Sequence, residues 1–246
     1  MNFDTEFAIH TLIIAIKAIP ITLKIVLFSF LLAFIPAFGI AIARVKNIRI
    51  VAVPARFFVS ANRGFPVLLQ ILIIYSFVPA LLNSFFERVG IKIKIFDLNP
   101  IVYAYIVFTL HCIASVSEIF RSALLTVSKG QYEAGLCIGL SVIQTYRRII
   151  LPQALVSAIP NLCNTVVGLL KSTSLAYYMT IKDVTGAAMT QASIGYNYIE
   201  AYLDVFLIYI VLCSGTQLLF RSFEKRLNVG KNGGIKPKSY FKKIAA

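Results

Sequence analysis

The residues best placed to act on another molecule lie between 130 and 152, in a polar segment between two long apolar runs. Such a segment of a membrane protein meets water, where it can dock a partner. Glu133 falls in the first turn of an expected helix, where the dipole favours a carboxylate, and Gly139 is expected to end that helix. Ser141 suits the cap of a second helix, and Pro152 the first turn of the next membrane helix. The segment predicts two short helices that form a docking surface, with an ordinary amphipathic turn as the alternative.

Four ionisable side chains near the apolar runs are candidates for a cavity or a partner, because a charge against lipid is costly. Arg63 precedes a Gly-x-Pro break and could attract a substrate carboxylate, or anchor to a lipid headgroup instead. Glu118 and Arg121 are three residues apart on one helix face, which predicts a structural ion pair. Lys171 follows a long uncharged run and precedes three hydroxyl residues. It could face a substrate or a gate, or reach the lipid interface.

The sequence offers little that would support catalysis or metal binding. Its four cysteines form no C-x-x-C pair and are typical of small core residues, while His10 and His111 stand alone. It contains no G-x-x-x-x-G-K-[ST] stretch for a nucleotide phosphate. We therefore expect no metal, no bound cofactor and no enzymatic activity in this chain.

The composition is that of a membrane protein. Of 246 residues, 59% are hydrophobic and 14% are charged, whereas about a quarter of a soluble domain is charged. Five uncharged windows approach the length that a spanning helix requires, namely 25–43, 64–86, 98–117, 149–170 and 205–220. A further uncharged window, 184–199, contains Gly, Thr, Gln and Asn, which favour a loop or a partly buried turn. The predicted fold is all-α and integral to the membrane, with five transmembrane helices.

The placement of charge predicts an orientation. The net charge of +14 could suggest nucleic acid, but most basic residues lie after the first, third and fifth windows. Because positive loops stay in the cytoplasm, we expect the N-terminus outside, the C-terminus inside and no nucleic-acid partner. Residues 1–18 would form an outer segment and 19–227 the membrane domain, including the loop 128–152. Residues 228–246 would form a basic, disordered cytoplasmic tail near anionic lipid headgroups.

Several motifs, in this order and spacing, resemble the ABC importer permeases for polar amino acids. The run E-A-x-x-x-x-G-x(9)-I-x-L-P, from Glu133 to Pro152, resembles the coupling loop on which ATP-hydrolysing subunits push. Residues 62–70 (NRGFPVLLQ) look like the signature F-R-G-T-P-L-L-V-Q. Residues 118–121, 129–134, 152–154 and 170–175 resemble E-I-x-R, K-G-Q-x-E-A, P-Q-A and L-K-D-T-S-L. Together these motifs cover roughly residues 20–227.

The resemblance implies the type I ABC importer permease fold and the role of its transmembrane subunit. Two permeases, identical or paralogous, would pair around a pathway in the cell membrane. Two ATPase subunits would bind ATP and Mg, and an external binding protein would deliver an amino acid. Coupling to the ATPase is expected at Gln131, Glu133, Ala134, Gly135, Gly139, Leu151 and Pro152. The substrate pathway is expected at Ser60, Arg63, Gly64, Pro66, Gln70, Asn164, Lys171, Ser172, Thr173 and Ser174.

Two departures from the family pattern bear on the substrate. Ser60 and Ser172 stand where many relatives have carboxylates that could hold a cationic side chain, which favours a zwitterionic or neutral amino acid. Residues 194–202 (IGYNYIEAY) also resemble a form found among cystine permeases, so L-cystine is the first candidate. An ATP-independent transporter or channel subunit is the alternative function, although it would have no use for the 128–152 loop. A membrane enzyme is favoured still less.

Overall fold

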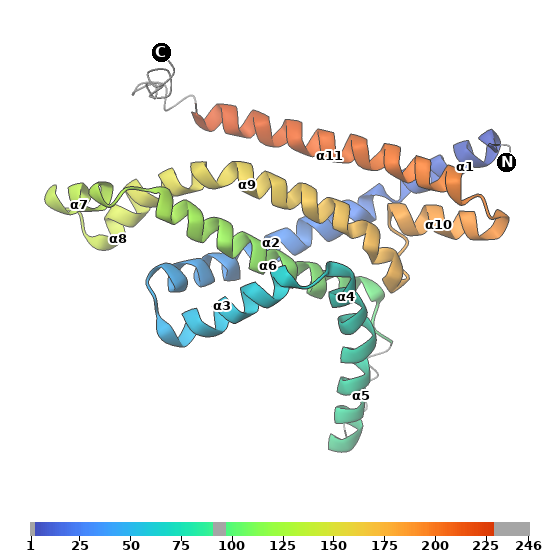
Figure 1. Cartoon of the computed structure of the whole chain (residues 1–246), viewed down its shortest axis with the longest axis horizontal. Helices are drawn as coiled ribbons and strands as arrows, with labels where there is room; N and C mark the ends of the chain where they lie inside the picture. Colours follow the sequence, from blue (N-terminus) through green and yellow to red (C-terminus); the bar gives the residue numbers. More distant parts are fainter. Residues whose placement is uncertain (1–2, 91–96, 229–246) are drawn as a thin grey trace, which may run out of the picture.

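The computed structural model describes residues 3–90 and 97–228, and every regular element in these two ranges is a helix (Figure 1). The elements are α1 (Thr5–Lys17), α2 (Ile19–Val45), α3 (Arg49–Gly64), α4 (Val67–Leu72), the π-helix η1 (Ile73–Phe77), α5 (Val78–Val89), α6 (Pro100–Thr126), α7 (Lys129–Cys137), α8 (Val142–Thr145), the π-helix η3 (Tyr146–Ile150), α9 (Leu151–Ser172), the 3-10 helix η4 (Thr173–Met179), α10 (Val184–Gly195) and α11 (Tyr198–Asn228). The predicted all-α class is confirmed. The expected tail lies outside the described residues except for Asn228.

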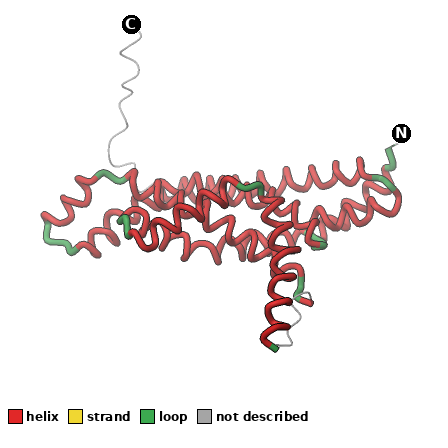
Figure 2. Tube along the Cα trace, turned by 60° about the horizontal axis from the view of Figure 1, so that its bottom comes forward, coloured by secondary structure: helices red, strands yellow, loops and turns green. Residues whose placement is uncertain are grey.

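The long helices α2, α6, α9 and α11 lie side by side in an elongated bundle (Figures 1 and 2). The helices α7 and α8 form one end of this bundle, and α1 and α10 lie at the other end. The helix α5 projects sideways from the bundle (Figures 1 and 2). Among the residues that the structure describes, five stretches are long and apolar enough to cross a membrane, as predicted: Thr5–Val45, Val67–Val89, Pro100–Thr126, Val142–Met179 and Tyr198–Arg226.

Small side chains allow α2 and α6 to pack closely along the centre of the bundle. On α2, Ser29, Ala33, Ala37 and Ala41 recur every four residues and are fully buried. Residues four apart share one helix face, and small residues on such a face let two membrane helices approach each other. Larger side chains of α6, among them Phe108, fill the space on either side. This seam is the structural axis on which the other helices are placed.

The first apolar stretch is longer than the sequence windows indicated. Residues 1–18 were expected to form an outer segment, but a helix begins at Thr5, where the Asp4 carboxylate accepts a hydrogen bond from the N–H of Phe7 at 3.0 Å. This helix contacts α10 and α11 through the buried residues Thr11 and Ala15. Lys17 and Lys24 interrupt this apolar stretch, so the uncharged window begins only at residue 25.

The prediction of a loop or turn at 184–199 is wrong, because residues Val184–Gly195 form the buried helix α10. The Asp183 carboxylate caps it by accepting a hydrogen bond from the N–H of Gly186 at 2.8 Å. The Thr22 hydroxyl of α2 accepts one from the N–H of Val184 at 3.2 Å. The chain passes so closely here that a Cβ on Gly186 would lie 2.1 Å from the carbonyl oxygen of Ile181. The cap and the burial of small alanines therefore outweigh the weak helix propensity of the segment.

Both π-helical stretches lie directly before a proline. Pro79 follows η1 and Pro152 follows η3, each two residues after the last residue of the π-helix. A proline ring clashes with the carbonyl four residues back, and the proline lacks the N–H that would bond to it. In these two places the preceding turn widens to i→i+5 hydrogen bonds, which accommodates the proline without ending the helix. Each widening changes the direction in which the preceding residues point.

Candidate functional site

The two short helices expected on either side of Gly139 are present at one end of the bundle (Figure 1), although Glu133 lies beyond the first turn of α7, where it was expected. Gly139, with φ of 82°, follows the end of α7 in the left-handed conformation that favours glycine. Ser141 then caps α8: its hydroxyl accepts the N–H of Gln144 at 3.3 Å, while its own N–H donates to the Gln144 side chain at 2.9 Å. The turn is therefore specified by local hydrogen bonds on both sides of the glycine.

Gly135 sets the distance between α7 and α8. A Cβ at this position would lie 2.6 Å from Cγ2 and 2.9 Å from Oγ1 of Thr145. Thr145 is fully buried, and its hydroxyl donates to the Ser141 carbonyl at 3.0 Å. The rings of Tyr132 and Tyr146 meet edge to face at 5.9 Å and join α7 to η3. The glycine that departs from E-A-A thus lies where the two helices approach each other most closely.

The outer surface of this helix pair combines exposed apolar and charged side chains. Ile138 and Ile143 are 74% and 79% exposed, and Glu133, Arg147 and Arg148 are exposed beside them. Large apolar groups on a water-facing turn mark a site for another protein. The turn is tied to α9 through the Gln153 side chain, which donates to the Ile149 carbonyl at 3.0 Å and approaches the Gln131 side chain at 3.4 Å. A displacement of the turn would therefore also move the first residues of α9.

The expected ion pair between Glu118 and Arg121 is present, and it has a third member. The carboxylate of Glu118 accepts hydrogen bonds from Arg121 Nε at 3.0 Å and from Arg44 Nη1 at 2.8 Å. Arg44 lies at the last turn of α2, so the cluster ties the end of α2 to α6. Sequence reasoning missed Arg44 because a basic residue just beyond an apolar run is typical of topological charge.

A polar cavity of about 480 Å³ lies between the end of α3 and the middles of α6 and α9. It is lined by Arg63, Ser115, Glu118, Ile119, Ser122, Asn161, Asn164 and Thr165. Arg63 has neither an ion pair nor a hydrogen bond to any described residue, whereas the carboxylate of Glu118 is held by two arginines. The cavity thus presents one unpaired cation together with amides and hydroxyls. Of its lining, only Arg63 and Asn164 were predicted pathway residues.

The other predicted pathway residues are not brought into this cavity. The Gln70 amide donates to the carbonyls of Asn62 at 2.9 Å and Phe65 at 3.0 Å, which holds the helix break at Gly64 and Pro66 in place. The hydroxyls of Ser172, Thr173 and Ser174 donate to carbonyls of α9 three or four residues earlier. Lys171 lines a different cleft, of about 400 Å³, with residues of α11. Ser60 is exposed on α3.

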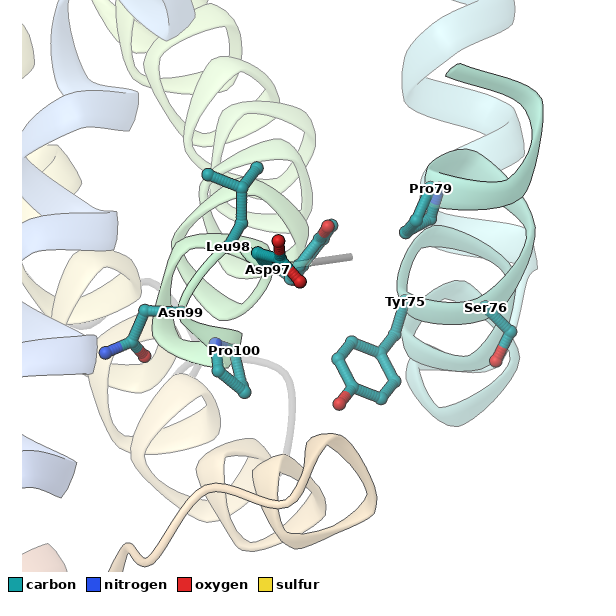
Figure 3. A pocket seen from close by; sticks show the side chains of 8 residues that line it. Tyr75, Ser76, Pro79, Asp97, Leu98, Asn99 and Pro100 are labelled. Atoms are coloured by element: carbon teal, nitrogen blue, oxygen red, sulfur yellow. The ribbon is translucent and has the colours of Figure 1, made fainter. Parts of the chain in front are cut away.

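A third hollow, of about 720 Å³, lies between η1 and the beginning of α6, away from α7 and α8 (Figures 1 and 3). Tyr75 and Ser76 of η1 line it on one side, and Asp97 and Asn99 line it on the other; the Tyr75 ring points toward the beginning of α6 (Figure 3). Sequence reasoning gave no indication of this hollow, because the residues on its two sides form no motif within either segment. Within 3–90 and 97–228, no three His, Cys, Asp or Glu side chains are grouped as metal ligands.

The bundle of membrane helices with a capped helix pair at one end is the architecture of a type I ABC importer permease. Solved structures confirm the fold. One described as a crystal structure of an amino acid ABC transporter with histidines matches with a TM-score of 0.77 at 24% identity, over 92% of this chain and all of that one. The MetNI methionine ABC transporter in an inward-facing conformation matches with a TM-score of 0.66 at 18% identity, over 87% of this chain and 96% of that one.

The chain belongs to the family of binding-protein-dependent transport system inner membrane components, whose model matches residues 35–229. The L-cystine transport system permease protein TcyL of Bacillus subtilis is 35% identical over 85% of either chain. The octopine transport system permease protein OccM of Rhizobium radiobacter is 36% identical over 86% of this chain and 85% of OccM. The probable amino-acid permease protein YxeN of Bacillus subtilis is 34% identical over 92% of this chain and 97% of YxeN. The chain is a multi-pass membrane protein and the permease component of an amino-acid ABC importer.

Proposed function

We propose that a zwitterionic amino acid enters the cell through this permease, driven by ATP hydrolysis in partner subunits that dock on α7 and α8. The observation that carries the proposal is the cavity at Arg63, which offers an unpaired guanidinium beside Asn161 and Asn164. A guanidinium binds a carboxylate through paired, charge-assisted hydrogen bonds. The acid in the lining, Glu118, is already held by Arg44 and Arg121, so a substrate with more positive than negative charges would leave a cation without a free partner there.

One of the named relatives, an L-cystine permease, supports this substrate class. L-cystine carries two carboxylates and two ammonium groups without net charge, which agrees with Ser60 and Ser172 in place of carboxylates. We therefore keep L-cystine as the first candidate substrate.

The surface of α7 and α8 supports docking of an ATPase. Exposed Ile138 and Ile143 provide apolar contact area, and the close approach of Gly135 to Thr145 makes the pair a stiff element. ATP and Mg would be bound by the partner subunits. Lys129, Arg147 and Arg148 lie at this end of the bundle, which supports a cytoplasmic location for it. The N-terminus would then lie outside, where a binding protein delivers the amino acid, and a second permease, identical or paralogous, would complete the pathway.

The test is uptake by the permease reconstituted in vesicles with its ATPase and binding protein. Neutral amino acids, L-cystine first, should be accumulated in the presence of ATP, and arginine and lysine should be accumulated poorly. Faster uptake of arginine than of every neutral amino acid would refute the substrate class. Undiminished uptake without ATP would instead favour an ATP-independent transporter or channel.

A further inference from the structure

One narrow face of the helix α3 carries three arginines and one serine along its whole length. Arg49, Arg56, Ser60 and Arg63 are spaced by seven, four and three residues, which places them on one narrow face of an α-helix. We call these four residues the arginine stripe. With a rise of about 1.5 Å per residue, its end positions lie about 21 Å apart. All four side chains are exposed.

The two faces beside the stripe have other tasks. On one side, Ala52, Ala55 and Val59 are buried where α3 contacts α2 and α6. On the other side, Ile50 and Phe57 are 88% and 78% exposed. The apolar face can meet hydrocarbon or another apolar surface. The arginine stripe is suited instead to water or to an anionic partner, because a charged side chain against hydrocarbon is costly.

The charges of the arginine stripe are not neutralised within the described part of the chain. Both ion pairs found there go to Glu118 and leave the stripe without an acid. Arg56 bonds only to neutral acceptors: its Nε donates to the Ala52 carbonyl and its Nη2 to the Asn47 side chain, each at 3.2 Å. Three positive charges therefore line one face of α3.

The arginine stripe connects the polar cavity with the end of the bundle that carries α7 and α8. Arg63, near the C-terminal end of α3, lines the cavity. Arg49, at the N-terminal end of α3, follows the turn after α2. In that turn, Lys46 Nζ lies 5.7 Å from the centre of the Tyr146 ring in η3. A molecule that leaves the cavity toward η3 can therefore pass along one guanidinium after another.

We propose that the arginine stripe is the exit path of the substrate carboxylate, which moves from Arg63 past Arg56 to Arg49 before it reaches the cytoplasm. Exposed guanidinium groups bind a carboxylate without holding it tightly, and several weak sites in series permit both entry and release. The same positive field repels cationic amino acids. The path thus selects amino acids whose charge is zero or negative. The inference rests on the proposed function, since it takes the cavity to be the substrate site.

The test compares two double variants in the complete reconstituted importer. Arg49→Gln with Arg56→Gln removes two charges of the arginine stripe but keeps Arg63. Arg49→Lys with Arg56→Lys keeps the charges but cannot reproduce the hydrogen bonds of Arg56 to Asn47 and Ala52. Arg226→Gln, an exposed arginine near the end of α11, is the matched control. Two quantities are measured: the amount of L-cystine taken up per ATP hydrolysed at saturating substrate, and the ratio of lysine to L-cystine taken up.

We expect the glutamine variant to lose roughly tenfold in uptake per ATP, the lower range for electrostatic focusing, and to take up relatively more lysine. The lysine variant should lose clearly less uptake than the glutamine variant and keep the unaltered ratio of lysine to L-cystine, because it keeps the charges but not the paired hydrogen bonds of arginine. Arg226→Gln should behave as the unaltered importer. Normal transport by the glutamine variant would overturn the inference. Equal losses in the glutamine and lysine variants would overturn it too, because the hydrogen bonds at the α2–α3 turn would then be the cause.

Vesicle composition separates the substrate carboxylate from lipid phosphate. The loss should be the same in vesicles of phosphatidylcholine alone and in vesicles that also contain phosphatidylglycerol. A loss confined to the anionic vesicles would show that the arginines anchor lipid headgroups, and it would overturn the inference. Absence of neutral amino-acid uptake by the unaltered importer would refute the proposed function itself, whereas the ratio between variants reports on the arginine stripe alone.

Discussion

At the scale of single residues, two glycines of α7 show what the glycine in place of the last alanine of the family's E-A-A motif does for the packing of α7 against α8. Gly135 lies against Thr145, whereas Gly130 has open space around the position of a Cβ. Both glycines are helical, so an alanine at either has the same backbone propensity. Their difference isolates the close approach of α7 to α8.

We therefore predict that Gly135→Ala is destabilising and weakens docking of the ATPase, whereas Gly130→Ala is neutral or slightly stabilising. Forcing a methyl group into a packed contact costs about 1–3 kcal/mol. Thermal unfolding of the purified permease and the yield of ATPase that co-purifies with it measure the two effects. Equal behaviour of the two variants would show that α7 and α8 separate at no cost.

Asp183 gives the described part of the chain a pH-dependent stability. Burial raises the pKa of its carboxyl group to about 6, although hydrogen bonds from the N–H groups of Gly186 and Thr185 and from the Tyr209 hydroxyl oppose the rise. The folded state therefore holds the proton more tightly than the unfolded state. The stability gained from this proton is fully present below about pH 4 and is lost as the pH rises through about 6.

The melting temperature of the permease in detergent should consequently contain a component that falls between about pH 4 and 6 and is constant above pH 6. Asp183→Asn retains an acceptor for the N–H of Gly186 but cannot ionise, so this component should be absent from the variant. The full effect is on the order of 3 kcal/mol. An identical pH profile in the two proteins would assign the pH dependence to other groups.

At the scale of elements, the sequence could predict those helix ends that are set by capping and helix-breaking residues close by in the chain. The α7–α8 turn follows from Gly139, Ser141 and Pro152, because positive φ, a capping hydroxyl and a missing N–H each act within one turn of helix. The helix α10 has a local cap in Asp183, but its burial against α1 and α11 and the bond from Val184 to Thr22 involve residues far away in sequence, so a pattern along the segment does not predict it. The cavity at Arg63 likewise needs three helices, so a pattern along one segment identifies only part of its lining.

The π-helix η3 is an element through which α7 and α8 are oriented relative to α9, and Pro152 is its cause. Pro152→Ala should allow a regular helix in place of η3, which rotates the preceding residues by up to about 100°. We predict that uptake per ATP then falls while the protein stays folded. Pro79→Ala is the matched control, because it removes the corresponding constraint on η1, far from the α7–α8 turn (Figure 1). Equal coupling in the two variants would contradict a role for η3.

At the scale of the whole molecule, the three hollows described above share no lining residue. The cavity at Arg63 adjoins the arginine stripe, the cleft at Lys171 lies between α9 and α11, and the hollow at Asp97 lies beside η1. Of the pathway residues expected from family motifs, some line the cavity at Arg63 or the cleft at Lys171. Others form hydrogen bonds to backbone carbonyls instead. Motif order records which segments a fold requires, but the distribution of charge around a cavity depends on how the helices pack.

The charge of the path should therefore be sufficient to set the substrate preference. Ser60 lies between Arg56 and Arg63 on the arginine stripe and is exposed, so a carboxylate there can pair with either arginine or with a cationic substrate. We predict that Ser60→Glu raises uptake of lysine and arginine relative to L-cystine by roughly tenfold, since one new close ion pair at an exposed site is worth about 1–2 kcal/mol. Ser60→Gln, which has the same size without the charge, should leave the ratio unchanged. Competition between radiolabelled L-cystine and unlabelled lysine in reconstituted vesicles measures the ratio directly. A rise in the glutamine variant as well would mean that side-chain volume, not charge, controls the preference, and it would remove the electrostatic basis for selecting zwitterions along α3.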